Sequence, residues 1–191
     1  MKRKAIQTVP VAVLLFAAIT LLDTSLLCAA VLLAAGVHEL GHLLAARLLR
    51  VRMTSLRVDF LGARLDASGR LLTYGEEWLL CAAGPIFSLF FSALLSPLWE
   101  IGFFWVQVSC ASVLLGALNL FPVKGFDGGR MLCSAVSYFG GEEKGEATLR
   151  WSSILSVLLL WGVAVYFLLR VGDGLSLFCF SMGLFARLFD R

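Results

Sequence analysis

The sequence predicts an all-α polytopic membrane protein, with about six transmembrane helices and a small β-hairpin between the second and third of them. Composition and apolar run length lead to this class. Hydrophobic residues make up 60% of the 191 residues, charged residues make up only 15%, and the mean hydropathy is +0.90. Several apolar runs also approach the roughly 20 helical residues that cross a bilayer core of about 30 Å.

Six apolar runs are candidates for these helices. We place them at residues 5–22, 25–46, 77–95, 101–121, 151–169 and 174–189. The first follows Lys2, Arg3 and Lys4, but no small-residue cleavage site comes after it, so we expect a retained helix and no cleaved signal peptide. We expect one transmembrane domain over residues 1–191, with its motifs within about residues 25–139 and no soluble accessory domain.

The distribution of basic residues predicts the orientation in the membrane. With the N-terminus inside and six crossings, every one of the 16 Lys and Arg residues except Arg170 falls on the inner side. Basic residues near helix ends are retained in the cytoplasm, so we expect both termini to be cytoplasmic. The net charge of +3 does not indicate nucleic acid as a partner, because no basic cluster is interleaved with aromatic residues.

The second apolar run contains the chemical signal that is strongest in this chain. It reads His38-Glu39-Leu40-Gly41-His42, an HExxH motif. Residues four apart share a helix face, so both imidazoles can bind one zinc ion while Glu39 reaches the bound water as catalytic base. The alternative is a chance arrangement of ordinary helix residues. Both histidines of the chain stand here, and an ionisable residue within a span costs about 2.5 kcal/mol or more, which favours the metal site.

Catalytic zinc takes three protein ligands, so a third must come from elsewhere in the chain. Asp127 is the candidate, because it follows a broken apolar segment in which Pro122 interrupts the helix and glycines allow close backbone approach. The alternative makes Asp127 the N-cap of a helix that runs to Phe139. Beside the HExxH motif, the ligand role is favoured.

Two motifs together resemble the site-2 protease family of intramembrane zinc metalloproteases. One is His38 to His42, and the other is Asn119, Pro122 and Asp127-Gly128 in an NxxPxxxxDG arrangement. The resemblance implies one Zn²⁺ held by the two histidines and Asp127, with Asn119 near the scissile carbonyl of the substrate. The family's GPxxN element is matched by Gly84-Pro85 with Ser88 in place of Asn, so no side-chain amide is present there.

The resemblance also implies a function. Members hydrolyse peptide bonds in or near transmembrane segments of membrane-anchored protein substrates, which is called regulated intramembrane proteolysis. The compact plan is similar to the branch of the stage IV sporulation protein FB, which implies a multi-pass protein of the bacterial cytoplasmic membrane, a regulatory membrane protein as a further partner, and a role in sporulation.

Residues 51–74 predict the hairpin. Leu56, Val58 and Phe60 alternate with charged residues, Asp66 to Gly69 is typical of a turn, and Leu71 to Tyr74 follows as a second strand. An edge strand containing Phe60 and Leu61 would bind an extended substrate by β-augmentation. A hairpin that only joins two spans is an equal alternative.

Two other functions compete with proteolysis as explanations of the HExxH motif. A noncatalytic membrane protein that uses the metal as a clamp would not need Glu39, and a structural zinc site is usually closed by four protein ligands. A metal transporter would need polar residues distributed along a pathway, and the other spans lack them. We therefore expect a zinc metalloprotease.

Overall fold

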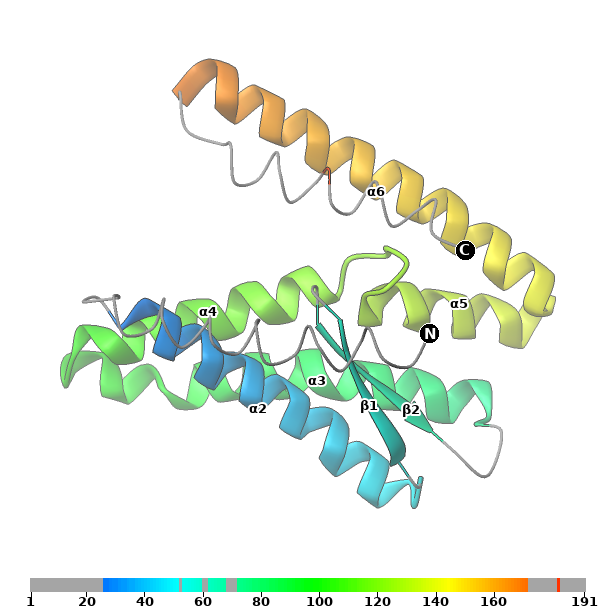
Figure 1. Cartoon of the computed structure of the whole chain (residues 1–191), viewed down its shortest axis with the longest axis horizontal. Helices are drawn as coiled ribbons and strands as arrows, with labels where there is room; N and C mark the ends of the chain where they lie inside the picture. Colours follow the sequence, from blue (N-terminus) through cyan, green and yellow to red (C-terminus); the bar gives the residue numbers. More distant parts are fainter. Residues whose placement is uncertain (1–25, 52, 60–61, 68–71, 172–181, 183–191) are drawn as a thin grey trace, which may run out of the picture. The chain divides into compact units, whose positions relative to one another are not determined.

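The structure is a computed structural model, and it describes residues 26–51, 53–59, 62–67, 72–171 and 182. The described elements follow in the order α2, β1, β2, α3, a short 3-10 helix, α4, α5 and α6 (Figure 1). Apart from Met182, the first and sixth predicted spans, residues 5–22 and 174–189, lie outside the described residues. The predicted edge-strand residues Phe60 and Leu61 lie outside them as well.

Three of the described helices are long and apolar enough to cross a membrane. They are α2 (Leu27–Leu48), α3 (Tyr74–Leu94) and α6 (Glu142–Val171). The apolar helix α4 (Phe103–Asn119) is shorter, because a 3-10 helix with Pro97 in its first turn (Ser96–Glu100) precedes it and Pro122 follows it. The protein is thus an integral membrane protein, but the described helices do not support the predicted total of six spans.

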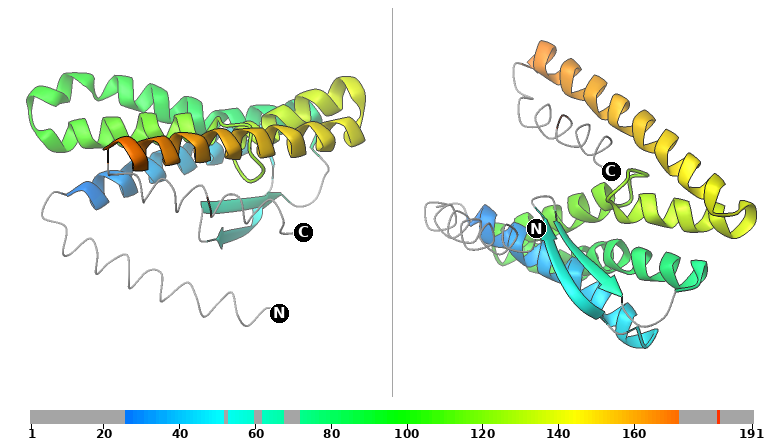
Figure 2. Two further views of the ribbon diagram at one scale, coloured as in Figure 1. Left: turned by 90° about the horizontal axis from the view of Figure 1, so that it is seen from above. Right: turned by 45° about the vertical axis from the view of Figure 1, so that its right-hand side comes forward.

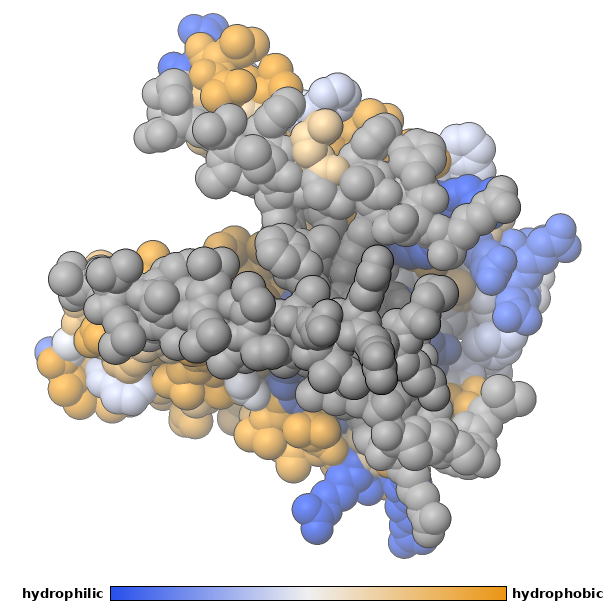
Figure 3. Space-filling model, in the orientation of Figure 1, coloured by the Kyte–Doolittle hydropathy of each residue, from blue (hydrophilic) through white to orange (hydrophobic). Residues whose placement is uncertain are grey.

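The surface of α6 fits an apolar solvent. Figure 3 shows hydrophobic residues over this helix. Its exposed large apolar side chains are Trp151, Leu155, Leu158, Leu159, Trp161, Val163, Tyr166, Phe167, Leu168 and Leu169. A monomer in water rarely exposes so continuous an apolar surface, whereas lipid tails solvate it without cost.

Two antiparallel strands lie between α2 and α3 in the sequence. β1 (Met53–Asp59) pairs with β2 (Gly62–Ala67), and the pairing ends with Asp59 opposite Gly62. The predicted turn and second strand were misplaced, since Asp66 lies within β2 and Tyr74 begins α3.

A capping box explains why a helix replaces the predicted second strand at Tyr74. The backbone N–H of Glu76 donates to the Thr73 hydroxyl at 3.3 Å, and the Thr73 N–H donates to the Glu76 carboxylate at 3.0 Å. These two bonds satisfy backbone donors that the first turn of a helix would otherwise leave unpaired. The capping residues therefore override the short apolar run that suggested a strand.

The described residues form two compact units. The first contains residues 1–71 and 86–116, where they are described. Its core joins Ala30 of α2, Leu95 at the N-cap of the 3-10 helix, and Val108 of α4. Packed against these are Phe91, Leu98, Phe104 and Trp105. The buried Ser109 hydroxyl donates to the Ser92 carbonyl at 2.9 Å, so the Ser92 hydroxyl donates to Ser109 Oγ, also at 2.9 Å. Paired hydroxyls of this kind link α3 to α4 without leaving a polar group unsatisfied.

The second unit contains residues 72–85 and 117–191, where they are described. In it α5 (Asp127–Gly140) runs beside α6 (Figure 2). The two helices approach closely at Gly145, where a Cβ atom would collide with the Ser137 hydroxyl. The core of this unit consists of Val123 and Phe126, from the loop before α5, and Val157 and Leu160 of α6.

Glycine is required at the start of α5. A Cβ atom on Gly128 would collide with the Leu120 carbonyl oxygen and lie 2.8 Å from that of Phe121, and one on Gly129 would collide with the Val123 carbonyl. Both glycines are buried. The loop from α4 therefore folds directly over the first turn of α5, and this fixes the direction in which the chain enters that helix.

We predict that Gly128→Ala destabilises the protein. Alanine within a helix normally stabilises it by about 1 kcal/mol relative to glycine, but the collision with loop carbonyls reverses the sign, and overpacking of this kind costs about 1–3 kcal/mol. The midpoint of thermal unfolding in detergent should fall by several degrees. Gly162→Ala in α6 is the control, because nothing lies within 4 Å of its added Cβ. An unchanged midpoint for Gly128→Ala would contradict the close packing of this loop.

Candidate metal centre

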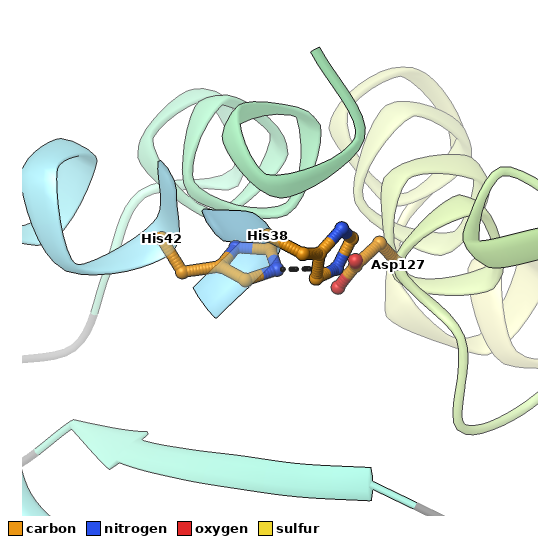
Figure 4. Close-up of side chains that lie close together, drawn as sticks. All are labelled: His38, His42 and Asp127. Atoms are coloured by element: carbon orange, nitrogen blue, oxygen red, sulfur yellow. Dashed lines mark hydrogen bonds between the residues drawn. The ribbon is translucent and has the colours of Figure 1, made fainter. Parts of the chain in front are cut away.

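His38 and His42 present their donor atoms to each other on α2. Their Nε2 atoms are 3.3 Å apart, and the ring centroids are 4.9 Å apart in an edge-to-face arrangement (Figure 4). Two nitrogens that bind one tetrahedral zinc ion at about 2.0–2.1 Å are separated by about 3.3 Å. The observed spacing therefore fits a shared metal ion.

Ser88 of α3 holds the other nitrogen of His38. The Ser88 hydroxyl lies 3.0 Å from His38 Nδ1, and the two residues are 0% and 4% exposed. A hydrogen bond at Nδ1 sets the rotation of the imidazole and leaves Nε2 for a metal, as the partners of metal-binding histidines usually do. Sequence reasoning missed this contact, and the only signal for it was the position of Ser88 in the Gly84-Pro85-x-x-Ser88 element.

Asp127 is the first residue of α5. Phe126 takes the N-cap position with extended backbone, at φ −100° and ψ 160°, and it makes no side-chain cap bond. The N-cap is therefore Phe126, and the alternative that made Asp127 the N-cap is wrong. The helix ends at Gly140, close to the expected Phe139. A carboxylate in the first turn is favoured by the positive end of the helix dipole.

The three predicted ligands come together. His38, His42 and Asp127 each offer one ligand atom, and these atoms all lie within 4.8 Å of one another (Figure 4). His38 is buried, and the other two residues are partly buried. Two imidazole nitrogens and one carboxylate oxygen are a donor set that catalytic zinc uses, and three protein ligands leave the fourth position open to water.

Two other predicted site residues, Glu39 and Asn119, are half-buried. Glu39 follows His38 on α2, and Asn119 is the last residue of α4. Both make interactions within the protein.

A further charged pair lies in the second unit and was not foreseen. Arg130 Nη2, one turn after Asp127 on α5, lies 3.1 Å from Glu77 Oε1 in the first turns of α3. The side chains are 34% and 33% exposed, so solvent screens this ion pair and its contribution to stability is small. Its effect is to tie α5 to α3. The sequence signal was an Arg three residues after a candidate ligand.

Two comparisons with known proteins found similar chains. The chain is 33% identical over 134 residues to a Ralstonia nicotianae protein that is provisionally named a zinc metalloprotease. The match covers 68% of this chain and 26% of that protein, so the chain spans about a quarter of the length of this relative. The fold is similar to that of the site-2 protease from Methanocaldococcus jannaschii, with a TM-score of 0.68 and 19% identity. That likeness covers 92% of this chain and 83% of the other. No family model matches the chain.

The structure thus places an HExxH motif on an apolar helix of a membrane protein, beside a carboxylate that could complete a metal site. The comparisons support the site-2 protease family that the two motifs predict. The structural likeness, at 19% identity, shows a shared fold and nothing more. Neither comparison specifies the branch of the stage IV sporulation protein FB.

We predict that Ser88→Ala weakens zinc binding. Loss of the hydroxyl frees the His38 ring to rotate and leaves a buried Nδ1 without this partner, and partners of this kind are typically worth about 10–100-fold in metal affinity. Competition with a chromophoric chelator measures the change. Ser92→Ala is the control, because it removes a buried hydroxyl one turn further along α3 that bonds Ser109 and touches no histidine. Equal affinities for the two variants would contradict a role of Ser88 in holding His38.

Proposed function

We propose that this protein is an intramembrane zinc metalloendopeptidase that hydrolyses peptide bonds in or near the transmembrane segments of membrane-anchored proteins. The observation that carries the proposal is the cluster of His38, His42 and Asp127, whose ligand atoms lie within 4.8 Å of one another. The same apolar helix that supplies both histidines also supplies Glu39. Three ligands and an adjacent carboxylate are what metal-assisted hydrolysis of a peptide requires.

In this proposal one zinc ion is held by His38 Nε2, His42 Nε2 and a carboxylate oxygen of Asp127. When bound, zinc lowers the pKa of a coordinated water and polarises the substrate carbonyl. Ser88 keeps His38 oriented through Nδ1. Asp127 lies in the first turn of α5, where the helix dipole favours the negative charge that a carboxylate ligand carries.

Glu39 transfers a proton from the attacking water to the leaving amine. Its carboxylate accepts a proton from water as the water oxygen bonds to the peptide carbonyl carbon, and it then donates that proton to the leaving amine nitrogen as the C–N bond breaks. One water is consumed, and a carboxyl group and an amine are formed. The Asn119 side-chain amide donates to the substrate carbonyl oxygen and so favours the geometry in which charge develops there.

A helical substrate must be unwound before cleavage, because its carbonyls are occupied by bonds within the helix. We propose that the strand pair β1 and β2 provides the template. Within the described residues this sheet has two strands, so each strand has one edge not occupied by the other. Such an edge binds an extended backbone by β-augmentation, and the contact residues that the sequence predicts are Phe60 and Leu61.

We further propose six spans with both termini in the cytoplasm, a location in the bacterial cytoplasmic membrane, and regulated intramembrane proteolysis as the cellular role. The charge distribution supports the orientation, since Arg170 alone falls outside. The partners would be a membrane-anchored substrate and a regulatory membrane protein, with a role in sporulation if the branch resemblance extends to function. Attaching a topology reporter after residue 23, 100 or 172 tests the orientation.

The competing function is a noncatalytic binding protein that uses the metal as a clamp. It would bind membrane segments through the same apolar helices but would have no use for a carboxylate next to His38. A structural zinc site is usually closed by four protein ligands, whereas the described residues supply a cluster of three. The effect of removing the Glu39 carboxylate distinguishes the two functions.

We predict that Glu39→Gln abolishes proteolysis and retains zinc. The amide cannot accept the proton, and general base catalysis contributes about 10²–10⁴-fold to a rate. Quantitative mass spectrometry of native-host membranes should show uncut precursors that accumulate in the variant, while metal analysis of the purified protein shows zinc at the wild-type level. Asp127→Asn is the matched comparison, because it lowers zinc affinity and activity together. Unchanged fragments in every growth condition, with zinc still bound, would favour the clamp.

We predict that Phe60→Pro or Leu61→Pro prevents cleavage without releasing zinc. Proline removes a backbone donor and cannot pair within a strand, so an extended substrate would lose its template. Cleavage of a substrate identified from the Glu39→Gln comparison is the readout. The control is Phe60→Tyr, which keeps the backbone donor and the aromatic ring. Unimpaired cleavage by both proline variants would mean that the hairpin only connects α2 to α3.

A further inference from the structure

Two adjacent serines of α6 hydrogen-bond to the loop between α4 and α5. The Lys124 backbone N–H donates to Ser153 Oγ at 2.8 Å, and the Ser153 hydroxyl donates to the Leu149 carbonyl at 2.6 Å. Ser153 is 0% exposed, so this hydroxyl is both donor and acceptor in a water-free position. The Ser152 hydroxyl lies 2.9 Å from the Pro122 carbonyl oxygen, to which it can donate.

The same loop also packs against α6 through apolar side chains. Val123 and Phe126 are 1% and 8% exposed and contact Val157 and Leu160. On α6, residues 153, 157 and 160 follow the i, i+4, i+7 spacing of one helical face. Ala164, at 0% exposure, continues that face. The loop thus packs against one face of α6, through Ser153, Val157 and Leu160.

Little regular structure holds this loop by itself. Its own backbone bonds are short-range ones, from the Val123 N–H to the Phe121 carbonyl at 2.8 Å and from the Phe126 N–H to the Val123 carbonyl at 3.0 Å. Gly125 adopts a φ of +103°, which favours glycine. The loop leads directly into Asp127, three residues after Lys124. An irregular segment at membrane depth needs partners from other elements, and here the serines of α6 provide them.

We propose that Ser152 and Ser153 of α6 are positioning residues for Asp127, because they hold the Pro122–Phe126 loop that sets where the carboxylate stands. This inference rests on the proposed function, in which Asp127 is a zinc ligand. It assigns α6 a role in positioning a ligand, in addition to its length and composition as a candidate membrane span. A movement of α6 would reach the metal centre through these hydrogen bonds.

Zinc affinity tests the proposal, measured on the full chain in lipid nanodiscs by competition with a chromophoric chelator. Ser153→Ala and Ser152→Ala remove the bonds to Lys124 and Pro122, and each should lower zinc affinity by about 10–100-fold, as loss of other outer-shell partners does. Ser156→Ala is the matched control. It removes a half-buried hydroxyl from the same helix, one turn from Ser152, and should leave the affinity unchanged.

A double-mutant cycle separates positioning from general destabilisation. If Ser153 acts through Asp127, then Ser153→Ala has no further effect on zinc affinity in an Asp127→Asn background, where the two histidines bind alone. An equal fold-loss in both backgrounds would overturn the proposal, and so would wild-type affinity in both serine variants. If Ser153→Ala does not fold, as judged by thermal unfolding without zinc, the same cycle with Ser152→Ala decides.

The cycle also distinguishes this inference from the function on which it rests. Asp127→Asn with wild-type zinc affinity would overturn the proposed ligand set and the positioning role together. A large loss in Asp127→Asn beside unchanged Ser152→Ala and Ser153→Ala would overturn the positioning role alone. A loss in all three, with the serine effect absent once Asp127 is replaced, is the result expected from a loop that α6 holds in place.

Discussion

An imidazole buried on an apolar helix loses its hydration and must find polar partners inside the protein, and most of the local structure follows from how His38 finds them. It is 4% exposed, with Ser88 at Nδ1 and His42 at Nε2. The face of α2 that carries it is otherwise made of small buried residues, namely Ala30, Ala34, Gly41 and Ala46. Small residues permit close helix packing, and close packing lets a hydroxyl as short as that of serine reach the ring.

The carboxylate side of the site is built by a different means. Asp127 stands at the end of an irregular loop, and the neighbouring backbone is packed so closely that Gly128 and Gly129 have no room for a Cβ atom. The loop is held by hydrogen bonds and apolar contacts from α6. A helix supplies its ligands through its own periodicity, whereas a loop must be fixed from outside. This difference is the reason for our proposal that residues without any metal-binding chemistry bear on the candidate metal centre.

Ser88 shows how a departure from a family pattern can keep a local function. The resemblance to the site-2 proteases leads one to expect an amide at this position, and this chain has a hydroxyl. Both groups can bond an imidazole nitrogen, but the hydroxyl is smaller and offers a single donor. Its complete burial, at 0% exposure, and its 3.0 Å distance from His38 Nδ1 indicate that the packing around this position suits the shorter side chain.

The sequence by itself determined the apolar helices α2, α3, α4 and α6, because the bilayer imposes a length and a hydropathy that a single segment must satisfy alone. The predicted ends lie within a few residues of the observed ones, except at the start of α6, which begins at Glu142. It also placed His38 and His42 on one helix face, because the spacing of four residues settles this locally. The nearness of Asp127 could be anticipated only from motif chemistry.

Features that depend on contacts between distant residues were decided by the tertiary structure. The bond from Ser88 to His38 joins residues 50 apart, and the bond from Lys124 to Ser153 joins residues 29 apart. The start of α3 at Tyr74 and the N-cap at Phe126 went against sequence expectation, the first because a capping box outweighed an apolar run. Local periodicity thus identifies the residues that bear the chemistry, and only packing across the fold decides which side chains hold them in place.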